Sequence, residues 1–152
     1  MIRSYRDADF DALVERWHAT NRASFPYVPV QQAHTLDDAR RFFRGHVVGA
    51  CVIRVAEENG ILQGLIAQQG AWIRHLAVFP AFQQRGIGSA LLRTAQAAAP
   101  TELRLFTFQR NAAARAFYER HGFAAVAFGI SPAPELEPDV EYRWRASPPA
   151  AA

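Results

Sequence analysis

One segment constrains the fold more than any other: an apolar run ends, a turn containing a proline follows, and two glycines open an amphipathic helix. The residues at positions 79–92 read FPAFQQRGIGSALL. Apolar side chains at positions 87, 91, 92 and 95 lie on one side of a helix expected over residues 86–99, which Pro100 stops. A buried strand that leads through a glycine turn into a helix is typical of an α/β domain.

The flanking patterns predict the remaining elements. We expect strands at residues 2–6, 51–57, 61–68, 71–79, 102–108, 124–128 and 140–144. We expect further helices from residue 9, at 35–43 and at 111–121, which gives the order β-α-α-β-β-β-α-β-α-β-β. The middle strands therefore form an antiparallel meander before strand–helix–strand crossovers begin. All of them belong to one domain, residues 1–146, which a disordered tail follows at residues 147–152.

Local signals mark the ends of several elements. Asn59-Gly60 predicts a tight hairpin turn, because both residue types tolerate positive φ. Thr35, with Asp38 three residues later, predicts a capping box at the start of the second helix. Gly122 is expected to close the helix at 111–121, with Phe123 placed for the hydrophobic contact of a Schellman cap.

Composition excludes several classes of protein. The 152 residues contain one cysteine, so neither an internal disulfide nor a multi-cysteine metal site is available, and we expect no metal. The 17 basic residues are all arginine and are scattered along a chain of net charge +3, which argues against nucleic-acid binding. The apolar runs are shorter than a membrane span and the first residues do not resemble a signal peptide, so we expect a cytoplasmic protein with no membrane partner.

The glycine turn predicts an anion site, best suited to phosphate. A helix N-terminus carries unsatisfied N–H groups and partial positive charge, and a Cβ at Gly86 or Gly88 would keep a pyrophosphate from the backbone. A dinucleotide fingerprint needs glycine or alanine where Leu91 stands, and a P-loop needs a lysine that the chain lacks. The alternative is that the glycines only cap the helix or allow close packing.

Two motifs together resemble the GNAT N-acetyltransferase superfamily. The pattern Gln83-x-x-Gly86-x-Gly88, after a strand that ends Val-x-Pro, is similar to its acyl-CoA-binding motif. The sequence NAAARAFYERHGF at residues 111–123 is similar to its second signature. The resemblance implies a mixed, mostly antiparallel central sheet with helices on both faces. It also implies acetyl-CoA as co-substrate and direct attack, in a ternary complex, by a primary amine of a small molecule or peptide.

The same resemblance assigns roles to individual residues. Tyr118 would protonate the departing CoA thiolate, as a group that keeps its proton at neutral pH. The strand before the turn would splay from the strand at 102–108, so that its backbone pairs with the pantetheine arm and the amide at Val78 polarises the thioester. The residues expected to bind the cofactor are Leu76, Val78, Gln83, Gln84, Arg85, Gly86, Ile87, Gly88, Ser89 and Asn111.

The general base is not identified by the motifs. Trp72 and Arg74 occupy the positions where the family often carries an acidic residue or histidine, and neither is a base. His75 is adjacent, but strand alternation turns it to the opposite face unless a bulge redirects it. The more remote candidates are His18, His34 and Glu141.

The acceptor site is expected beside the first helix and the same strand. Phe25 and Tyr27, in a proline-flanked loop, are candidates for substrate contact together with Trp72 and Arg74. Arginine at position 74 suggests an acceptor that carries a carboxylate. The alternative functions are a non-catalytic acyl-CoA-binding or regulatory module of the same fold, and a nucleotide-phosphate binder unrelated to CoA. The last strand, residues 140–144, is available in this interpretation to pair across a homodimer.

Overall fold

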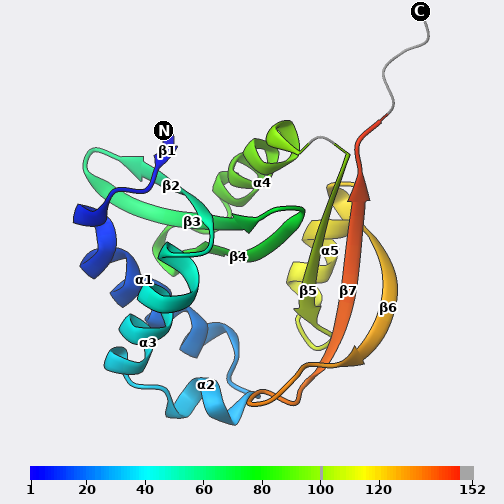
Figure 1. Ribbon diagram of the computed structural model, residues 1–152, viewed down its shortest axis with the longest axis horizontal. Helices are drawn as coiled ribbons and strands as arrows, with labels where there is room; N and C mark the ends of the chain where they lie inside the picture. Colours follow the sequence, from blue (N-terminus) through cyan, green and yellow to red (C-terminus); the bar gives the residue numbers. More distant parts are fainter. Residues whose placement is uncertain (100, 148–152) are drawn as a thin grey trace, which may run out of the picture.

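The computed structural model describes residues 1–99 and 101–147 as an open, seven-stranded sheet flanked by helices (Figure 1). The strands run in the order β1-β2-β3-β4-β5-β7-β6, and only the β4–β5 neighbours are parallel. The strands are β1 Ile2–Ser4, β2 Val52–Glu58, β3 Ile61–Gln69, β4 Trp72–Val78, β5 Glu102–Phe108, β6 Ala124–Ile130 and β7 Pro138–Arg145. The helices are α1 Phe10–Ser24, α2 Pro29–Ala33, α3 Leu36–Phe42, α4 Ile87–Ala98 and α5 Ala112–Arg120.

The sheet separates two hydrophobic cores. Leu65 and Ala67 of β3 pack with α1 and α3 on one face, whereas Ile66 between them packs with α4 and α5 on the other. Because successive side chains of a strand point to opposite faces, the apolar run of residues 65–67 in one strand supplies both cores. The prediction of a mostly antiparallel sheet with helices on both faces is confirmed.

The predicted turn and cap signals are present. Asn59 and Gly60 have φ values of 52° and 78°, as the hairpin requires. Thr35 caps α3 and accepts a hydrogen bond from the Asp38 N–H at 3.1 Å. At the end of α5, the Phe123 N–H donates to the Tyr118 carbonyl at 3.0 Å, the bond that defines a Schellman cap.

The structure also contains elements that the sequence patterns did not predict. The short helix α2 begins at Pro29, where the sequence indicates only a loop, and a π-helical turn, Phe43–Val48, extends α3. Proline is well suited to a first helical position, so the same residue fits a loop or a helix start. Pro100, the predicted helix stop, and residues 148–152 of the predicted tail lie outside the described residues.

The expected dimer contact through the last strand is wrong. Strand β7 lies between β5 and β6 and pairs with both over almost its whole length, so neither of its sides is free. The exposed edge is β6, because the chain returns past it to insert β7. Among residues 1–99 and 101–147, no helix is long and apolar enough to cross a membrane.

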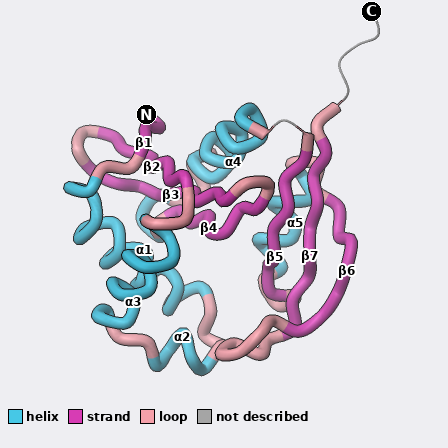
Figure 2. The backbone as a smooth tube through the Cα atoms, viewed as in Figure 1, coloured by secondary structure: helices cyan, strands magenta, loops and turns pink. Residues whose placement is uncertain are grey.

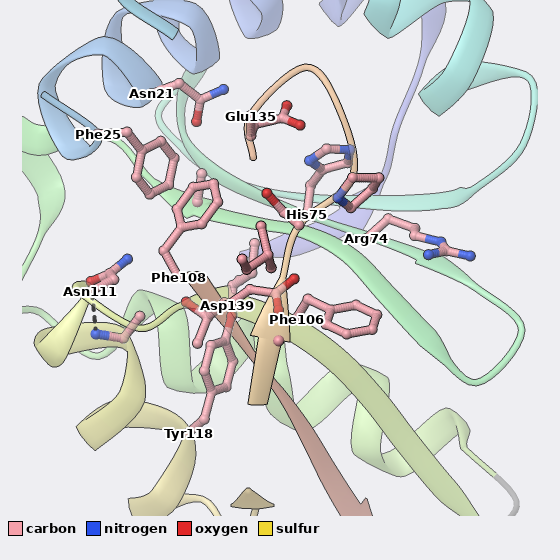
Figure 3. A pocket seen from close by; sticks show the side chains of 18 of the residues that line it. Asn21, Phe25, Arg74, His75, Phe106, Phe108, Asn111, Tyr118, Glu135 and Asp139 are labelled. Carbon is pink, nitrogen blue, oxygen red and sulfur yellow. Dashed lines mark hydrogen bonds between the residues drawn. The ribbon is translucent and has the colours of Figure 1, made fainter. Parts of the chain in front are cut away.

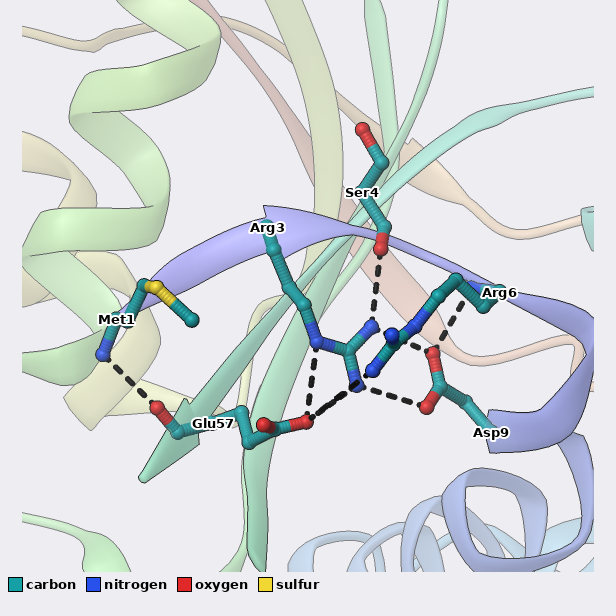
Figure 4. A network of polar contacts seen from close by, with 6 residues as sticks. All are labelled: Met1, Arg3, Ser4, Arg6, Asp9 and Glu57. Carbon is teal, nitrogen blue, oxygen red and sulfur yellow. Dashed lines mark hydrogen bonds and ion pairs between the residues drawn. The ribbon is translucent and has the colours of Figure 1, made fainter. Parts of the chain in front are cut away.

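An ion network fixes the N-terminal strand to the sheet (Figure 4). The Arg3 guanidinium donates two hydrogen bonds of 2.8 Å to the Asp9 carboxylate and a third, from Nε, of 3.0 Å to Glu57. Asp9 lies at the entry to α1 and Glu57 on β2. The network therefore holds β1, α1 and β2 together at the edge of the sheet opposite to β6.

Candidate active site

The site is built on a gap in the sheet between β4 and β5. Within the part of the chain that is described, these parallel strands pair at one position, Trp72 with Arg104, and then diverge (Figure 2). The Arg104 N–H also donates to the Ala71 carbonyl at 2.8 Å, which holds the strands together at their N-terminal ends. The expected splay of these two strands is therefore present.

A cavity of about 600 Å³ fills the gap (Figure 3). Its walls come from β4 and β5, from α1 and the residue that follows it, from α5, and from β6, the loop after it and the start of β7. The aromatic and charged residues that line it are Trp17, Phe25, Arg74, His75, Phe106, Phe108, Tyr118, Phe128, Glu135 and Asp139.

The backbone of β4 presents free hydrogen-bonding groups to this gap. The Phe79 N–H donates to the Gln63 carbonyl of β3 at 2.9 Å. Alternate residues of a strand direct their backbone groups to opposite sides, so Leu76 and Val78 direct theirs toward β5, which no longer pairs with β4 there. The Gln83 side chain donates to the Val78 carbonyl at 3.0 Å, which leaves the Val78 N–H available.

The glycine turn leads from β4 into α4 beside the cavity rather than within its lining. Gln84 and Gly86 both have positive φ, 64° and 81°, so the chain bends sharply on either side of Arg85. Gly86 is the N-cap of α4 and has no side chain to accept from the first N–H groups of the helix. Those donors are therefore free to bind an anion.

The second motif places two polar side chains on the cavity wall. The Asn111 Oδ1 caps α5 by accepting from the Ala114 N–H at 3.1 Å, which leaves its Nδ2 donor free. Tyr118 lines the cavity and is 8% exposed. Burial raises the pKa of its phenol well above the ordinary value, because the ionised form loses solvation. Arg115, on the same helix, donates from Nε to the Tyr142 hydroxyl at 3.1 Å.

His75 lines the cavity beside a bulge in β4, and it projects to the same face of the sheet as Ala77, as strand alternation predicts. Ala67 pairs with His75 but its neighbour Gln68 pairs with Ile73, so Arg74 is an extra residue in β4. The His75 ring lies 5.5 Å from the Trp17 ring, centre to centre, in an edge-on arrangement. Burial, together with the adjacent Arg74 charge, lowers the pKa of His75 to about 4.

The four predicted acceptor-site residues are only partly brought together. Phe25 lines the cavity, and its ring packs edge-on against Phe108 at 5.1 Å between centres. Arg74 is exposed at the rim, where its Nε donates to Gln69 at 3.2 Å. Tyr27 and Trp72 are absent from the lining. The Trp72 indole instead stacks on Phe106 at 5.3 Å.

Of the remote base candidates, His18 and His34 line a smaller adjoining cavity, and Glu141 pairs with Arg104 at 3.6 Å outside both cavities. Asp139 and Glu135 line the main cavity and were not predicted from the sequence. Glu135 lies in the proline-rich loop before β7 and Asp139 directly follows that loop, which carries no readable periodicity, so no sequence signal marked either residue. Among the described residues, no group of three or more acidic, histidine or cysteine side chains is placed to hold a metal.

Two parallel strands separate here beside a helix N-terminus. This is the arrangement expected of acyl-CoA-dependent transferases, the class that the two sequence motifs predicted. Residues 3–123 match the sequence model of the Acetyltransferase (GNAT) family. The chain belongs to this family, and it is an acyltransferase.

One curated protein is similar to this chain in sequence, and solved structures are similar to it in fold. The peptidyl-lysine N-acetyltransferase YiaC of Escherichia coli is 29% identical over 127 residues, which are 83% of this chain and 84% of YiaC. The solution structure of apo YjaB from E. coli superposes with a TM-score of 0.78 at 22% identity, over 95% of this chain and 96% of YjaB. The PaiA N-acetyltransferase of Thermoplasma acidophilum, solved with coenzyme A, gives 0.71 at 15% identity, over 96% and 98% of the two chains.

Proposed function

We propose that this protein transfers the acetyl group of acetyl-CoA to a primary amine of a small molecule or peptide, by direct attack in a ternary complex. The observation that carries the proposal is the gap between β4 and β5, with free backbone groups on one wall and Tyr118 on another. Relatives solved with coenzyme A or acetyl-CoA, and the peptidyl-lysine acetyltransferase YiaC, support the same choice of co-substrate and reaction.

The geometry suggests how the co-substrate would be held. The free N–H groups at the start of α4, from Ile87 to Ser89, suit the pyrophosphate, and Gln83, Gln84 and Arg85 shape the turn around it. Leu76 and Val78 would pair with the pantetheine arm as an added strand does, and the free amide of Asn111 would support them.

The chemistry then needs polarisation of the thioester and a proton for the leaving group. The Val78 N–H points into the gap and is the proposed donor to the developing oxyanion. Tyr118 keeps its proton because it is buried, so it can donate that proton to the departing thiolate. Holding both substrates in one cavity supplies orientation, the largest share of the expected acceleration.

Calorimetric titration with acetyl-CoA is the first test. We expect binding by the wild type and none by Gly86→Glu, because that change places a carboxylate at the proposed pyrophosphate site. Thiol release with a panel of amines then tests turnover, and Tyr118→Phe should lower kcat by about 100-fold or more without changing acetyl-CoA affinity. Binding without thiol release for any amine would favour the non-catalytic module instead.

We also propose a homodimer formed through β6. Ala124–Ile130 is an edge strand whose seven residues are all exposed and uncharged, and its outer backbone groups have no partner within the described residues. Such an edge is self-complementary, because two copies related by a two-fold axis pair antiparallel. Val126→Lys should give a monomer in sedimentation experiments if the wild type is a dimer by this edge.

The expected cytoplasmic location stays a prediction.

A further inference from the structure

We propose that Asp139 accepts the proton of the incoming amine, and that the acceptor is an ammonium carried on an apolar body. This inference rests on the proposed acetyl transfer and adds the residue that the family motifs left unassigned. Four observations on the cavity carry it: the position of Asp139, its lack of an ionic partner, the space above it and the apolar surface beside it.

Asp139 is held on rigid strands at the open end of the gap. It is the second residue of β7 and lies in register with Phe108 of β5 and Gly129 of β6. Directly paired residues of neighbouring strands project to the same side of a sheet, so Asp139 and Phe108 face the same space. Figure 3 shows Asp139 and Tyr118 among the side chains that line this cavity, from β7 and α5.

Among the described residues, Asp139 and Glu135 are the two carboxylates of the cavity lining that pair with no arginine, and Asp139 is the more buried of the two. Glu102 pairs with Arg104 and Arg143, Glu141 pairs with Arg104, and Glu137 pairs with Arg110. Within the described part of the chain, no ion pair and no side-chain donor engages the Asp139 carboxylate, although the residue is 7% exposed. A buried carboxylate without a cationic partner is costly, so a cationic ligand at this point would stabilise it.

A glycine keeps the approach to this carboxylate open. Gly129 lies opposite Asp139, and a Cβ there would stand 3.6 Å from the Asp139 Oδ1. Any larger side chain would extend from that point over the carboxylate. The absence of a side chain at position 129 therefore leaves room for an amine.

The other titratable or charged groups of the cavity fit the role less well. His75 and Arg74 face it from β4, Tyr118 from α5 and Glu135 from the loop before β7. The lowered pKa of His75 makes its ring a poor proton acceptor. Arg74 is a cation and cannot act as a base, Tyr118 keeps its proton because burial raises its pKa, and Glu135 is more exposed than Asp139. Burial raises the pKa of Asp139 above its ordinary value, which strengthens it as a base.

The step balances with the groups at hand. An ammonium enters beside the Asp139 carboxylate and gives it one proton, and the nitrogen lone pair so freed attacks the thioester carbon. Collapse of the tetrahedral intermediate breaks the C–S bond, and the sulfur keeps the electron pair and takes the Tyr118 proton. The amide nitrogen then loses its second proton, which returns to the Tyr118 oxygen. The amide and the thiol leave, and Asp139 releases its proton to water.

The remaining surface of the cavity selects the body of the acceptor. Phe25 and Phe108 form an edge-on pair at 5.1 Å between ring centres, and Phe106 and Phe128 add apolar area to the same walls. The carboxylates of Asp139 and Glu135 repel an acceptor that carries a carboxylate next to its amine. The only opposing charge in the lining, Arg74, is at the exposed rim.

The decisive comparison is Asp139→Asn against Glu141→Gln, a carboxylate on the same strand outside the cavity. We expect Asp139→Asn to keep its acetyl-CoA affinity while kcat falls by about 100- to 10,000-fold. Glu141→Gln should keep the wild-type kcat. If Asp139→Asn retains kcat, or loses only acceptor affinity, the assignment is overturned. If the wild type itself releases no thiol with any amine, the proposed acetyl transfer fails first and this inference falls with it.

The pH profile of the wild type tests the same point even if Asp139→Asn does not fold. If Asp139 is the base, the decrease of kcat/KM at acid pH reports the protonation of an enzyme group. The midpoint of this decrease is then the same for two amines of different pKa. Without an enzymatic base, the midpoint moves with the pKa of each amine. The second result would overturn the proposal.

The acceptor class is tested with 2-phenylethylamine and phenylalanine, which differ only in a carboxylate. We expect a higher kcat/KM for 2-phenylethylamine. A preference for phenylalanine that Arg74→Ala abolishes would instead support recognition of a carboxylate at the rim, and it would overturn the acceptor class proposed here.

Discussion

The two glycines of the α4 turn should respond differently to the same substitution. Gly86 has a φ of 81°, and a Cβ there would meet nothing within 4 Å, so its requirement is conformational. A left-handed backbone costs an L-residue about 1–2 kcal/mol. In a chain of this length that loss corresponds to a decrease of about 2–8 °C in Tm for Gly86→Ala.

Gly88 has no such constraint. A Cβ at this position would lie 3.5 Å from both Phe117 and the Val78 Cγ2, an ordinary contact within the first turn of α4. Alanine is the better helix former, so Gly88→Ala should keep or raise Tm, by up to about 1 kcal/mol in stability. The added methyl group nevertheless lies beside the free N–H donors, and we expect acetyl-CoA affinity to fall about tenfold or more, a loss of about 1.4 kcal/mol or more.

Thermal unfolding by circular dichroism and calorimetric titration of acetyl-CoA separate the two effects. Gly86→Asn is the matched control, because asparagine tolerates positive φ and should recover part of the Tm that alanine loses. A wild-type Tm for Gly86→Ala would refute the conformational argument. Unchanged affinity for Gly88→Ala would show that this glycine serves packing against α5 and not phosphate binding.

Three further predictions concern the sheet, the ion network and the acceptor cavity. A Cβ at Gly64 would lie 2.6 Å from the Ala77 carbonyl oxygen, so Gly64→Ala should reduce the free energy of unfolding in urea by about 1–3 kcal/mol; an unchanged urea midpoint would contradict this contact. Arg3 lowers the pKa of Asp9, so the stability from this pair is present above the unfolded pKa of about 3.9 and is lost as the pH falls through the lower folded pKa. Urea unfolding should therefore show Asp9→Asn less stable than the wild type at pH 7, with a gap that narrows in acid; a gap independent of pH would exclude the ion pair as its cause. Phe25→Ala should raise KM for an aromatic amine and leave acetyl-CoA affinity unchanged, and equal losses for both ligands would mean that the loop has collapsed.

Much of the proposed cofactor half of the site could be predicted from local sequence. The turn at Gly86 and the cap at Asn111 each depend on residues within one turn of helix, and a single chain segment carries both the signal and the structure. The Schellman cap that ends α5 and positions Tyr118 is local in the same way. Backbone groups of adjacent residues make these features, so no distant contact is needed to specify them.

The acceptor half depends on contacts between distant segments. The bulge at Arg74 exists only in the register between β3 and β4, and it changes the face to which Trp72 and Ile73 point relative to the residues that follow. Trp72 lies outside the cavity lining, and its indole stacks on Phe106, which is 34 positions later in the chain. The face to which a strand side chain points depends on the register with the neighbouring strands, and the residues of the strand itself do not specify that register.

The sequence by itself determined the family, the order of the strands and the glycine turn that opens α4, since hydrophobic periodicity and short motifs encode them locally. The tertiary structure decided which carboxylates face the cavity and that β6, rather than β7, forms the edge of the sheet opposite to β1. Asp139 stands beside Phe108 and Gly129 only because β7 inserts between β5 and β6, and that insertion also leaves β6 at the edge. Strand order is set by the packing of the whole chain, so no local pattern could supply either answer.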